Sequence, residues 1–316
     1  MRVLITGGAG FLGSHLCDAL IARGDEILCI DNLSTGRAEN VAHLAGRTEF
    51  CLLRADVTGV FDAPGPFGAV AHLASPASPP AYLGRPLETL AVGSKGTENV
   101  LRIAERDAAR FLLASTSEVY GDPQVHPQPE NYWGNVNPVG PRSVYDEAKR
   151  YAEALTTAYR SARGVNTGIV RIFNTYGPRM GGSDGRIVTN FVSQALTGRP
   201  LTVYGDGRQT RSFCYVDDLV AGLVAMIDSS DAGPINLGNP EEFEVGDFAR
   251  LVLRVTGSSS PIEYRPLPDD DPTRRRPVIE RAAQRLGWKP ETPVEVGVRR
   301  MVEWFSARPD ELHPDD

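Results

Sequence analysis

The sequence has few cysteines, no long apolar run and no excess of positive charge. Its only cysteines are Cys17, Cys29, Cys51 and Cys214, and they form no CxxC pair and no Cys/His cluster. We therefore expect reduced thiols, without disulfides or a metal site. The longest apolar run near the middle of the chain, "LVAGLVAMI" at 219–227, is far shorter than the ~20 residues that cross a bilayer. An apparent strand follows Met1 at once, which leaves no room for a signal peptide, so the expected location is cytoplasmic.

The charge balance limits the kind of partner. A formal net charge of −7 argues against nucleic acid, because a phosphate backbone binds to a basic surface. A phosphorylated small molecule is compatible with this charge, since it needs only a few placed cations. The hydrophobic fraction of 41% and the charged fraction of 23% are typical of a globular protein. A chain of 316 residues suits one large domain, or a large domain with a smaller partner.

The first 115 residues alternate short β-rich runs with helical patterns. Strands are predicted at "VLIT" (3–6), "EILCI" (26–30), "EFCLL" (49–53), "AVAHL" (69–73) and "RFLLAS" (110–115), and helices at 11–23 and 87–106. Nearly continuous apolar strands separated by helices indicate a parallel sheet that is covered on both faces. The expected fold class is therefore α/β, with a Rossmann-like, doubly wound parallel sheet.

The second half of the chain is less regular. The proline-rich stretch 121–143 is long for a loop without a pattern, and we expect it to help enclose a functional site. The elements predicted after it are a helix at 143–163, a strand at 167–173, a helix near 187–197, short strands at 201–204 and 212–216, and helices near 217–228, 245–256 and 293–306. We predict a dinucleotide-binding domain at 1–173. Residues 174–316 are expected to form mainly a smaller α/β substrate-binding domain. Part of this segment is expected to return to the dinucleotide-binding domain.

A glycine-rich turn stands between the first predicted strand and the first predicted helix. "MRVLITGGAGFLGSHL" places Gly7, Gly10 and Gly13 where a chain must turn tightly, approach a diphosphate and pack helix against strand. The amides at the helix N-terminus then face the phosphates. Asp31 ends the second strand, 18 residues after Gly13, where a carboxylate can accept both ribose hydroxyls. No arginine follows at once in "DNLSTG", which favours NAD over NADP. Asp56 is placed either to reach the adenine or to cap a turn.

Two further segments carry groups that can react. "LLASTSEVYGDP" (112–123) is a strand that ends near Thr116 and Glu118, whose side chains share a face if the segment is extended. "SVYDEAKRYAEAL" places Tyr145 and Lys149 four residues apart on one helix face, a spacing that also arises by chance. A free tyrosine, with a pKa near ~10, is a poor base. A lysine ammonium and the positive nicotinamide ring would favour the phenolate, which can take the proton from a sugar hydroxyl while hydride leaves the same carbon.

These motifs resemble the short-chain dehydrogenase/reductase superfamily in its extended form, over nearly the whole chain and with GxxGxxG spacing. The resemblance implies that Tyr145 is the catalytic base, that Lys149 holds the nicotinamide ribose and that Thr116 orients the substrate hydroxyl. The remaining predicted cofactor contacts are Phe11, Leu12, Asn32, Thr35, Gly36, Val57, Leu73 and Ser75. The alternative from a different class is a non-catalytic NAD-binding sensor. Such sensors generally lose the Tyr or the Lys, and both are present here.

The surroundings of Glu118 separate the enzymes of this superfamily. Its 4-epimerases usually carry a small or neutral residue there, and its 4,6-dehydratases carry Thr-Asp-Glu, where this chain has Thr116-Ser117-Glu118. Together with "HPQPENYWGNVNPVGPRSVYDEAK", "RIFNTYGPRM" and "LTVYGDGRQTRSF", this stretch closely resembles the UDP-glucuronate decarboxylases. The resemblance implies NAD-dependent conversion of UDP-glucuronate to UDP-xylose by transient oxidation of carbon 4, loss of CO2 and re-reduction. A 4,6-dehydratase or a 4-epimerase is the alternative.

The same resemblance implies the substrate contacts. Arg275, in "DDDPTRRRPVI" (269–279), is expected to reach the sugar carboxylate and to join the catalytic set, with Glu118 acting on water or on carbon 5. The expected nucleotide contacts are Asn174 and Arg211 at the phosphates, with Arg186, Asn190 and Tyr204 nearby. The chain departs from the family where Ala91 replaces Lys, Gly93 replaces Asn and Ala148 replaces Gly. A homodimer is expected, formed through the helices at 87–106 and 143–163.

Overall fold

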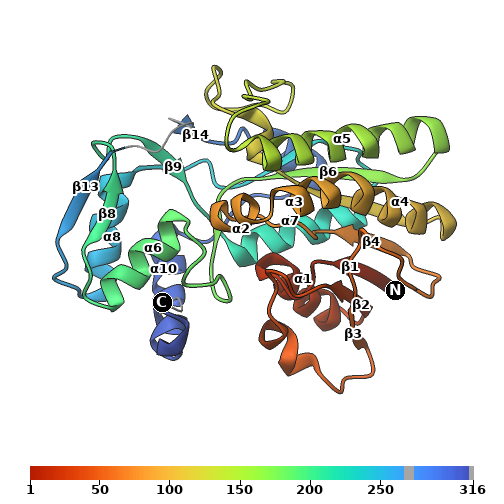
Figure 1. Ribbon diagram of the computed structural model, residues 1–316, viewed down its shortest axis with the longest axis horizontal. Helices are drawn as coiled ribbons and strands as arrows, with labels where there is room; N and C mark the ends of the chain where they lie inside the picture. Colours follow the sequence, from red (N-terminus) through yellow and green to blue (C-terminus); the bar gives the residue numbers. More distant parts are fainter. Residues whose placement is uncertain (267–273, 313–316) are drawn as a thin grey trace.

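A parallel sheet of seven strands forms the centre of the computed structural model (Figure 1), which describes residues 1–266 and 274–312. The strand order is β11-β6-β5-β4-β1-β2-β3, with every neighbouring pair parallel. The strands are β1 (Arg2–Thr6), β2 (Glu26–Asp31), β3 (Phe50–Arg54), β4 (Ala69–His72), β5 (Arg110–Thr116), β6 (Thr167–Ile172) and β11 (Ile235–Leu237). The order reverses between β1 and β4, where doubly wound sheets bind ligands. The predicted α/β fold is confirmed.

Helices cover both faces of this sheet (Figure 1). Val3 and Ile5 of β1 belong to the core formed with α1 (Phe11–Ala22) and α7 (Val216–Asp228), whereas Leu4 belongs to the core formed with α4 (Thr97–Arg106) and α5 (Ser143–Arg163). Neighbouring residues of a strand point to opposite sides, so a strand buried on both faces is apolar throughout. This is the pattern that the sequence displays.

The predicted helix at 87–106 is interrupted. It consists of α3 (Pro86–Ala91), a π-helical turn η2 (Val92–Gly96) and α4. A Cβ atom on Gly93 would lie 2.7 Å from the Cβ atom of Ala148 on α5, and also 2.7 Å from its carbonyl oxygen. Gly93 therefore lets the turn approach α5 more closely than any side chain would allow. The short helix α2 (Pro79–Gly84), which precedes α3, was not predicted.

A smaller part covers the carboxyl ends of the strands. Its small sheets pair β8 (Leu201–Tyr204) with β13 (Ile262–Arg265), β9 (Thr210–Ser212) with β12 (Glu242–Glu244) and β14 (Arg274–Arg275), and β7 (Thr175–Tyr176) with β10 (Cys214–Tyr215). Its helices are α6 (Ile187–Leu196), α8 (Val245–Thr256) and α10 (Val294–Ser306). The rings of Phe213 and Phe248 pack with centroids 4.2 Å apart, at the centre of its core. The predicted strand at 212–216 is divided between β9 and β10.

The chain returns from the smaller part to the large sheet. Strand β11 pairs with β6, and α7 and α9 (Glu280–Leu286) pack beside the sheet. The remaining elements are the 3-10 helices η1 (Ala38–Leu44), η3 (Ser117–Tyr120) and η4 (Pro309–Glu311). Within residues 1–266 and 274–312, no helix combines the length and apolarity that crossing a membrane requires. All four cysteines are free thiols.

Candidate active site

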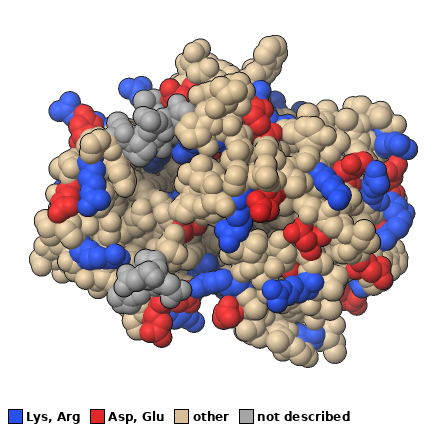
Figure 2. Space-filling model, in the orientation of Figure 1, with Lys and Arg blue, Asp and Glu red and all other residues tan. Residues whose placement is uncertain are grey.

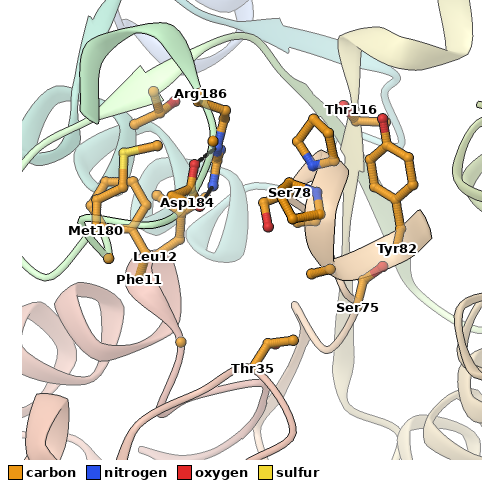
Figure 3. Close-up of a pocket in the computed structure, with 18 of the residues that line it drawn as sticks. Phe11, Leu12, Thr35, Ser75, Ser78, Tyr82, Thr116, Met180, Asp184 and Arg186 are labelled. Carbon is orange, nitrogen blue, oxygen red and sulfur yellow. Dashed lines mark hydrogen bonds and ion pairs between the residues drawn. The ribbon is translucent and has the colours of Figure 1, made fainter. Parts of the chain in front are cut away.

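A cavity of about 1120 Å3 lies at the carboxyl ends of the strands, between the large sheet and the smaller part. In Figure 2 the surface is hollowed in this region, and Figure 3 shows side chains that point into the cavity from both parts. Segments far apart in the chain meet here because parallel strands all end at the same edge of the sheet. Every residue that the sequence predicted for the site lines this cavity: Gly7, Gly10, Phe11, Leu12, Gly13, Asp31, Asn32, Thr35, Gly36, Asp56, Val57, Leu73, Ser75, Thr116, Glu118, Tyr145, Lys149, Asn174, Arg186, Asn190, Tyr204, Arg211 and Arg275.

The glycine-rich turn has the geometry of a diphosphate cradle. Gly7 has a φ of +74°, and a Cβ atom there would lie 2.7 Å from the Cα atom of Ala74. A Cβ atom on Gly13 would lie 2.1 Å from the carbonyl oxygen of Gly7, so only glycine lets helix and turn pack this closely. Helix α1 has no side-chain cap and no acidic residue in its first turn. Its first amides therefore face the cavity ready for an anion.

Asp31 lies beside this cradle at the end of β2. Its carboxylate accepts hydrogen bonds from the backbone N–H groups of Ala9 (3.0 Å) and Leu33 (2.8 Å). Burial raises the pKa of Asp31, although these two bonds oppose the shift. Arg37 also lines the cavity, but it is ion-paired with Glu311 of η4. A carboxylate fixed in this way suits the two hydroxyls of a ribose better than a 2′-phosphate.

The Asp56 carboxylate caps the turn that follows β3. Its carboxylate accepts hydrogen bonds from the backbone N–H (2.8 Å) and the hydroxyl (2.7 Å) of Thr58, and from the Asn32 amide (2.9 Å). The cap that the sequence allowed is therefore present, and Asp56 also lines the cavity. The structure is therefore compatible with Asp56 as a cap of this turn and with Asp56 as a contact of the adenine.

Tyr145 and Lys149 lie on the buried face of α5. The Lys149 Nζ atom is 5.8 Å from the centroid of the Tyr145 ring and donates a hydrogen bond to the Ala114 carbonyl at 2.8 Å. Thr116, at the end of β5, lines the same cavity. Tyr145, Lys149 and the Thr116 hydroxyl are thus assembled around one corner of the cavity.

Without a cofactor, the surroundings of this pair disfavour both charged forms. Burial, with a further contribution from the Glu118 charge, raises the pKa of Tyr145 above its ordinary value. Burial also lowers the pKa of Lys149 to about 8. For both side chains, removing the charged form from water costs more free energy than the neighbouring groups return. The residues of the chain alone therefore favour the protonated phenol of Tyr145, and the joint effect of Lys149 and the nicotinamide ring stays a prediction.

Glu118 is held between two arginines. Its Oε2 atom is 2.8 Å from Nη2 of Arg142, and its Oε1 atom accepts a hydrogen bond from Nη1 of Arg275. Burial would raise the pKa of Glu118, but the two positive charges outweigh it and lower the pKa to about 2. Glu118 is therefore a carboxylate at any physiological pH.

The backbone around Glu118 differs from the expected extended segment. Strand β5 ends at Thr116, and Glu118 lies in the 3-10 helix η3. The Thr116 hydroxyl accepts a hydrogen bond from the Glu118 backbone N–H at 3.2 Å and so caps this helix. Both side chains still reach the same cavity.

The sequence reasoning missed two lining residues of chemical interest. Arg142 immediately precedes α5, and it is the R of the quoted "GPRS" signal. Tyr82 of α2 stacks on Tyr145, with ring centroids 5.0 Å apart and planes at 7°. Its buried hydroxyl has no hydrogen-bond partner among the described residues. Figure 3 shows Tyr82 beside Thr116. No local pattern could have identified it, because its place depends on how α2 packs.

The predicted nucleotide contacts lie on the smaller part of the cavity wall. Arg186 pairs with Asp184, with Nη2 and Oδ2 2.8 Å apart (Figure 3). The Asn190 amide donates a hydrogen bond to the Gly185 carbonyl at 3.2 Å, and Tyr204 is 41% exposed. The acidic run at 269–271 lies outside the described residues, and within them no group of three or more His, Cys, Asp or Glu side chains is arranged to hold a metal ion.

One expectation about the cavity wall needs correction. Of the loop 121–143, only Pro141 and Arg142 line the cavity, because most of the loop packs against other segments. The loop therefore contributes one end to the wall and does not enclose the cavity as predicted. Lys95, close to the departures at Ala91 and Gly93, is exposed and does not line the cavity.

Similar solved structures support the fold. A UDP-glucose 4-epimerase from Thermotoga maritima with UDP-glucose superposes with a TM-score of 0.88 at 26% identity, covering 97% of this chain and 99% of that one. A UDP-glucuronic acid 4-epimerase from Bacillus cereus, in complex with UDP-glucuronic acid and NAD, has a TM-score of 0.85 at 25% identity, covering 97% and 99%.

Sequence relatives are closer. UDP-glucuronic acid decarboxylase 1 of Danio rerio is 52% identical over 96% of this chain and 72% of its own length. UDP-glucuronic acid decarboxylase 1 of Arabidopsis thaliana is also 52% identical, over 98% of this chain and 70% of its own length. Residues 3–246 match the model of the NAD dependent epimerase/dehydratase family. The chain belongs to that family, and within it to the UDP-glucuronic acid decarboxylases.

Proposed function

We propose that this protein is an NAD-dependent enzyme that converts UDP-glucuronate to UDP-xylose and CO2. The observation that carries the proposal is the Glu118 carboxylate, held between Arg142 and Arg275 beside Thr116 and Tyr145. The decarboxylase relatives at 52% identity support it. A 4,6-dehydratase would need a proton donor where this chain has Ser117.

NAD is the cofactor that the cavity fits. The first amides of α1 would take its diphosphate, Asp31 the adenosine ribose and Lys149 the nicotinamide ribose. Bound there, NAD accepts the hydride from sugar carbon 4 and returns it, so the reaction needs no external reductant. The other proposed contacts are Gly7, Gly10, Phe11, Leu12, Gly13, Asn32, Thr35, Gly36, Asp56, Val57, Leu73, Ser75 and Tyr145.

Tyr145 is the proposed base at the hydroxyl of carbon 4. Its phenolate would take the hydroxyl proton as carbon 4 becomes a ketone and would return the proton when carbon 4 is reduced again. Thr116, which lines the same cavity, would orient the sugar hydroxyl. The Lys149 ammonium lies close enough to favour the phenolate once a second positive charge is present.

Arg275 is the proposed partner of the sugar carboxylate. Its side chain is buried and lines the cavity, and its planar guanidinium, which pairs with Glu118 there, suits a second carboxylate. With a ketone at carbon 4, the bond between carbons 5 and 6 breaks, its electron pair forms the enolate of that ketone, and carbon 6 leaves as CO2. A proton then returns to carbon 5.

Because the pKa of Glu118 is about 2, Glu118 has no proton of its own to give to carbon 5. We propose that it orients the water that supplies this proton.

The smaller part of the chain is proposed to bind the nucleotide. Asn174 and Arg211 would hold the phosphates, and Arg186, Asn190 and Tyr204 would surround the uridine. This assignment makes residues 1–173 the NAD-binding domain and 174–316 mainly the substrate-binding domain, although β11 crosses back to the large sheet.

We further propose a cytoplasmic homodimer. Leu87 of α3 and Tyr151 of α5 are 76% and 53% exposed, as expected for apolar side chains that a second copy covers. Four free thiols fit a reducing compartment. Light scattering tests the assembly, and a monomer at micromolar concentration contradicts it.

Product analysis tests the activity. The purified protein with NAD is incubated with UDP-glucuronate, UDP-glucose or UDP-galacturonate, and the nucleotide sugars and CO2 are measured. We expect UDP-xylose and CO2 from UDP-glucuronate alone, with large losses in Glu118→Gln and Arg275→Ala. Formation of UDP-galacturonate without CO2 would instead identify a 4-epimerase, and wild-type rates in both variants would remove the assigned roles.

A further inference from the structure

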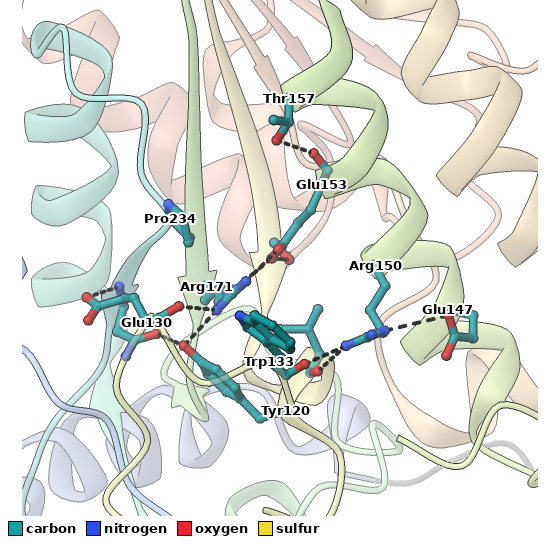
Figure 4. A network of polar contacts seen from close by, with 12 residues as sticks. Tyr120, Glu130, Trp133, Glu147, Arg150, Glu153, Thr157, Arg171 and Pro234 are labelled. Carbon is teal, nitrogen blue, oxygen red and sulfur yellow. Dashed lines mark hydrogen bonds and ion pairs between the residues drawn. The ribbon is translucent and has the colours of Figure 1, made fainter. Parts of the chain in front are cut away.

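The loop 121–143 is anchored on the large sheet and its helices by polar contacts (Figure 4). Arg171 of β6 donates a hydrogen bond to the Glu130 carbonyl at 3.1 Å, and Arg150 of α5 donates one to the Trp133 carbonyl at 2.9 Å. The backbone N–H of Asn236 on β11 donates to the Glu130 carboxylate at 3.1 Å. These bonds fix the loop to three elements of the large sheet and its helices.

From this position the loop holds the segment that carries Arg275. The backbone of Gln128 donates to the Arg276 carbonyl at 2.9 Å and accepts from the Val278 N–H at 3.0 Å. The Gln128 side chain adds a third bond, since its Oε1 atom accepts from the Arg276 N–H at 2.8 Å. We propose that Gln128 is a positioning residue for Arg275. Through Gln128, the loop fixes the orientation of the Arg275 guanidinium.

Gln128 is suited to this role because it is fully buried and held on every side. Its Nε2 atom donates to the Val125 carbonyl at 2.8 Å, and its own carbonyl accepts from the Asn236 amide at 2.9 Å. A side chain fixed at both ends of its amide transmits position better than one that is free to rotate.

The backbone of Arg275 lies in a short strand. Strand β14 has two residues and pairs in parallel with β9, where Arg275 lies opposite Arg211, and the Arg275 carbonyl also accepts a bond from the Ser212 hydroxyl at 3.3 Å. The bonds from Gln128 extend this support to Arg276 and Val278, which follow β14. The same loop also meets the guanidinium, since Nη2 donates to the Gly121 carbonyl at 2.9 Å. The loop thus contacts the Arg275 guanidinium through Gly121 and the next residue of the chain, Arg276, through Gln128.

The test compares two ligands that differ only at carbon 6. It rests on the proposed function, because it takes Arg275 as the residue that meets the sugar carboxylate. Gln128→Met keeps the side-chain volume and the backbone bonds but removes the side-chain bond to the Arg276 N–H. We expect it to weaken UDP-glucuronate binding about tenfold, measured by titration calorimetry with NAD present, and to leave UDP-glucose binding within about twofold. In an Arg275→Ala background the same substitution should have no further effect on either ligand.

Two controls complete the design. Tyr132→Phe removes a bond inside the same loop, from the Gln124 N–H at 3.0 Å, without touching the Arg276 segment, and should bind both ligands like the wild type. If Gln128→Met does not fold, Gln128→Glu takes its place; it keeps an acceptor for the Arg276 N–H and should retain the preference for UDP-glucuronate. An unchanged preference in Gln128→Met, a lost preference in Gln128→Glu, or a further loss in the Arg275→Ala background overturns the proposal. A wild-type protein without any preference for UDP-glucuronate would instead contradict the proposed function.

Discussion

Replacing Glu118 by Gln should destabilise the protein in a manner that depends on pH. The two arginines beside it lower the pKa of Glu118 from 4.5 to about 2. At about 1.4 kcal/mol per pKa unit, this difference makes the ionised carboxylate contribute about 3 kcal/mol to the free energy of unfolding at pH 7. Glutamine keeps the shape but not the charge, and it leaves Arg275, which is buried, without its anion.

The sign of the effect follows from the direction of the shift. A pKa that is lower in the folded state stabilises the protein above the unfolded value of about 4.5, and this stabilisation is lost as the pH falls toward 2. The stability difference between wild type and Glu118→Gln should therefore stay constant from pH 7 to 5. Below about pH 4.5 it should narrow by about 1.4 kcal/mol per pH unit.

Denaturant unfolding at pH 7, 5, 4 and 3.5 measures this difference. Glu295→Gln is the matched control, because Glu295 pairs with Arg299 at 3.2 Å on the exposed face of α10. Its effect should be small at every pH. A Glu118→Gln protein that is as stable as the wild type at pH 7, or a difference that does not change below pH 4.5, refutes the assignment of a strongly paired carboxylate.

Three further predictions concern other residues of the site. Gly93→Ala should lower the free energy of unfolding by about 1–3 kcal/mol in thermal denaturation, and Ala148→Gly should restore only part of it, because the Ala148 carbonyl also blocks the new methyl group. Tyr82→Phe should be as stable as the wild type or slightly more so, since the hydroxyl it removes is buried without a partner among the described residues. Lys149→Met should unfold at a higher temperature at pH 7, and its advantage should shrink above pH 8 as the wild-type ammonium, with a pKa of about 8, loses its proton.

Most elements of the fold were predictable because they depend on local pattern. Helix α5 begins and ends at the predicted residues, and six of the seven strands of the large sheet differ by a residue or so from the predicted runs. Strand β11 (Ile235–Leu237) was not predicted. The break in the helix at 87–106 could not be predicted. It depends on contact between Gly93 and Ala148, which are distant in the chain, and nothing in the helical pattern of 87–106 marks it.

The same limit applies to the site. Sequence motifs identified residues that line one cavity, because the glycine turn, the strand end at Thr116 and the Tyr145 helix each belong to a strand end or helix start. They did not show that Glu118 lies in a turn, nor that it meets Arg142 and Arg275, 24 and 157 residues away. Contacts of this kind follow from the topology, so only the three-dimensional arrangement could supply the charge balance around Glu118.

The two buried charged groups of the site, Glu118 and Lys149, differ in how far neighbouring charges compensate their burial. Glu118 and Lys149 are both removed from water. For Glu118 the two arginines outweigh burial, whereas burial prevails for Lys149, whose partners among the described residues are the Ala114 carbonyl, the Tyr145 ring and the Glu153 charge. A fold selected for stability alone would pair Lys149 as fully as Glu118. An ammonium left under-compensated next to Tyr145 is instead poised to interact with a ligand, so its stability cost is itself an argument that this corner of the cavity is where the reaction occurs.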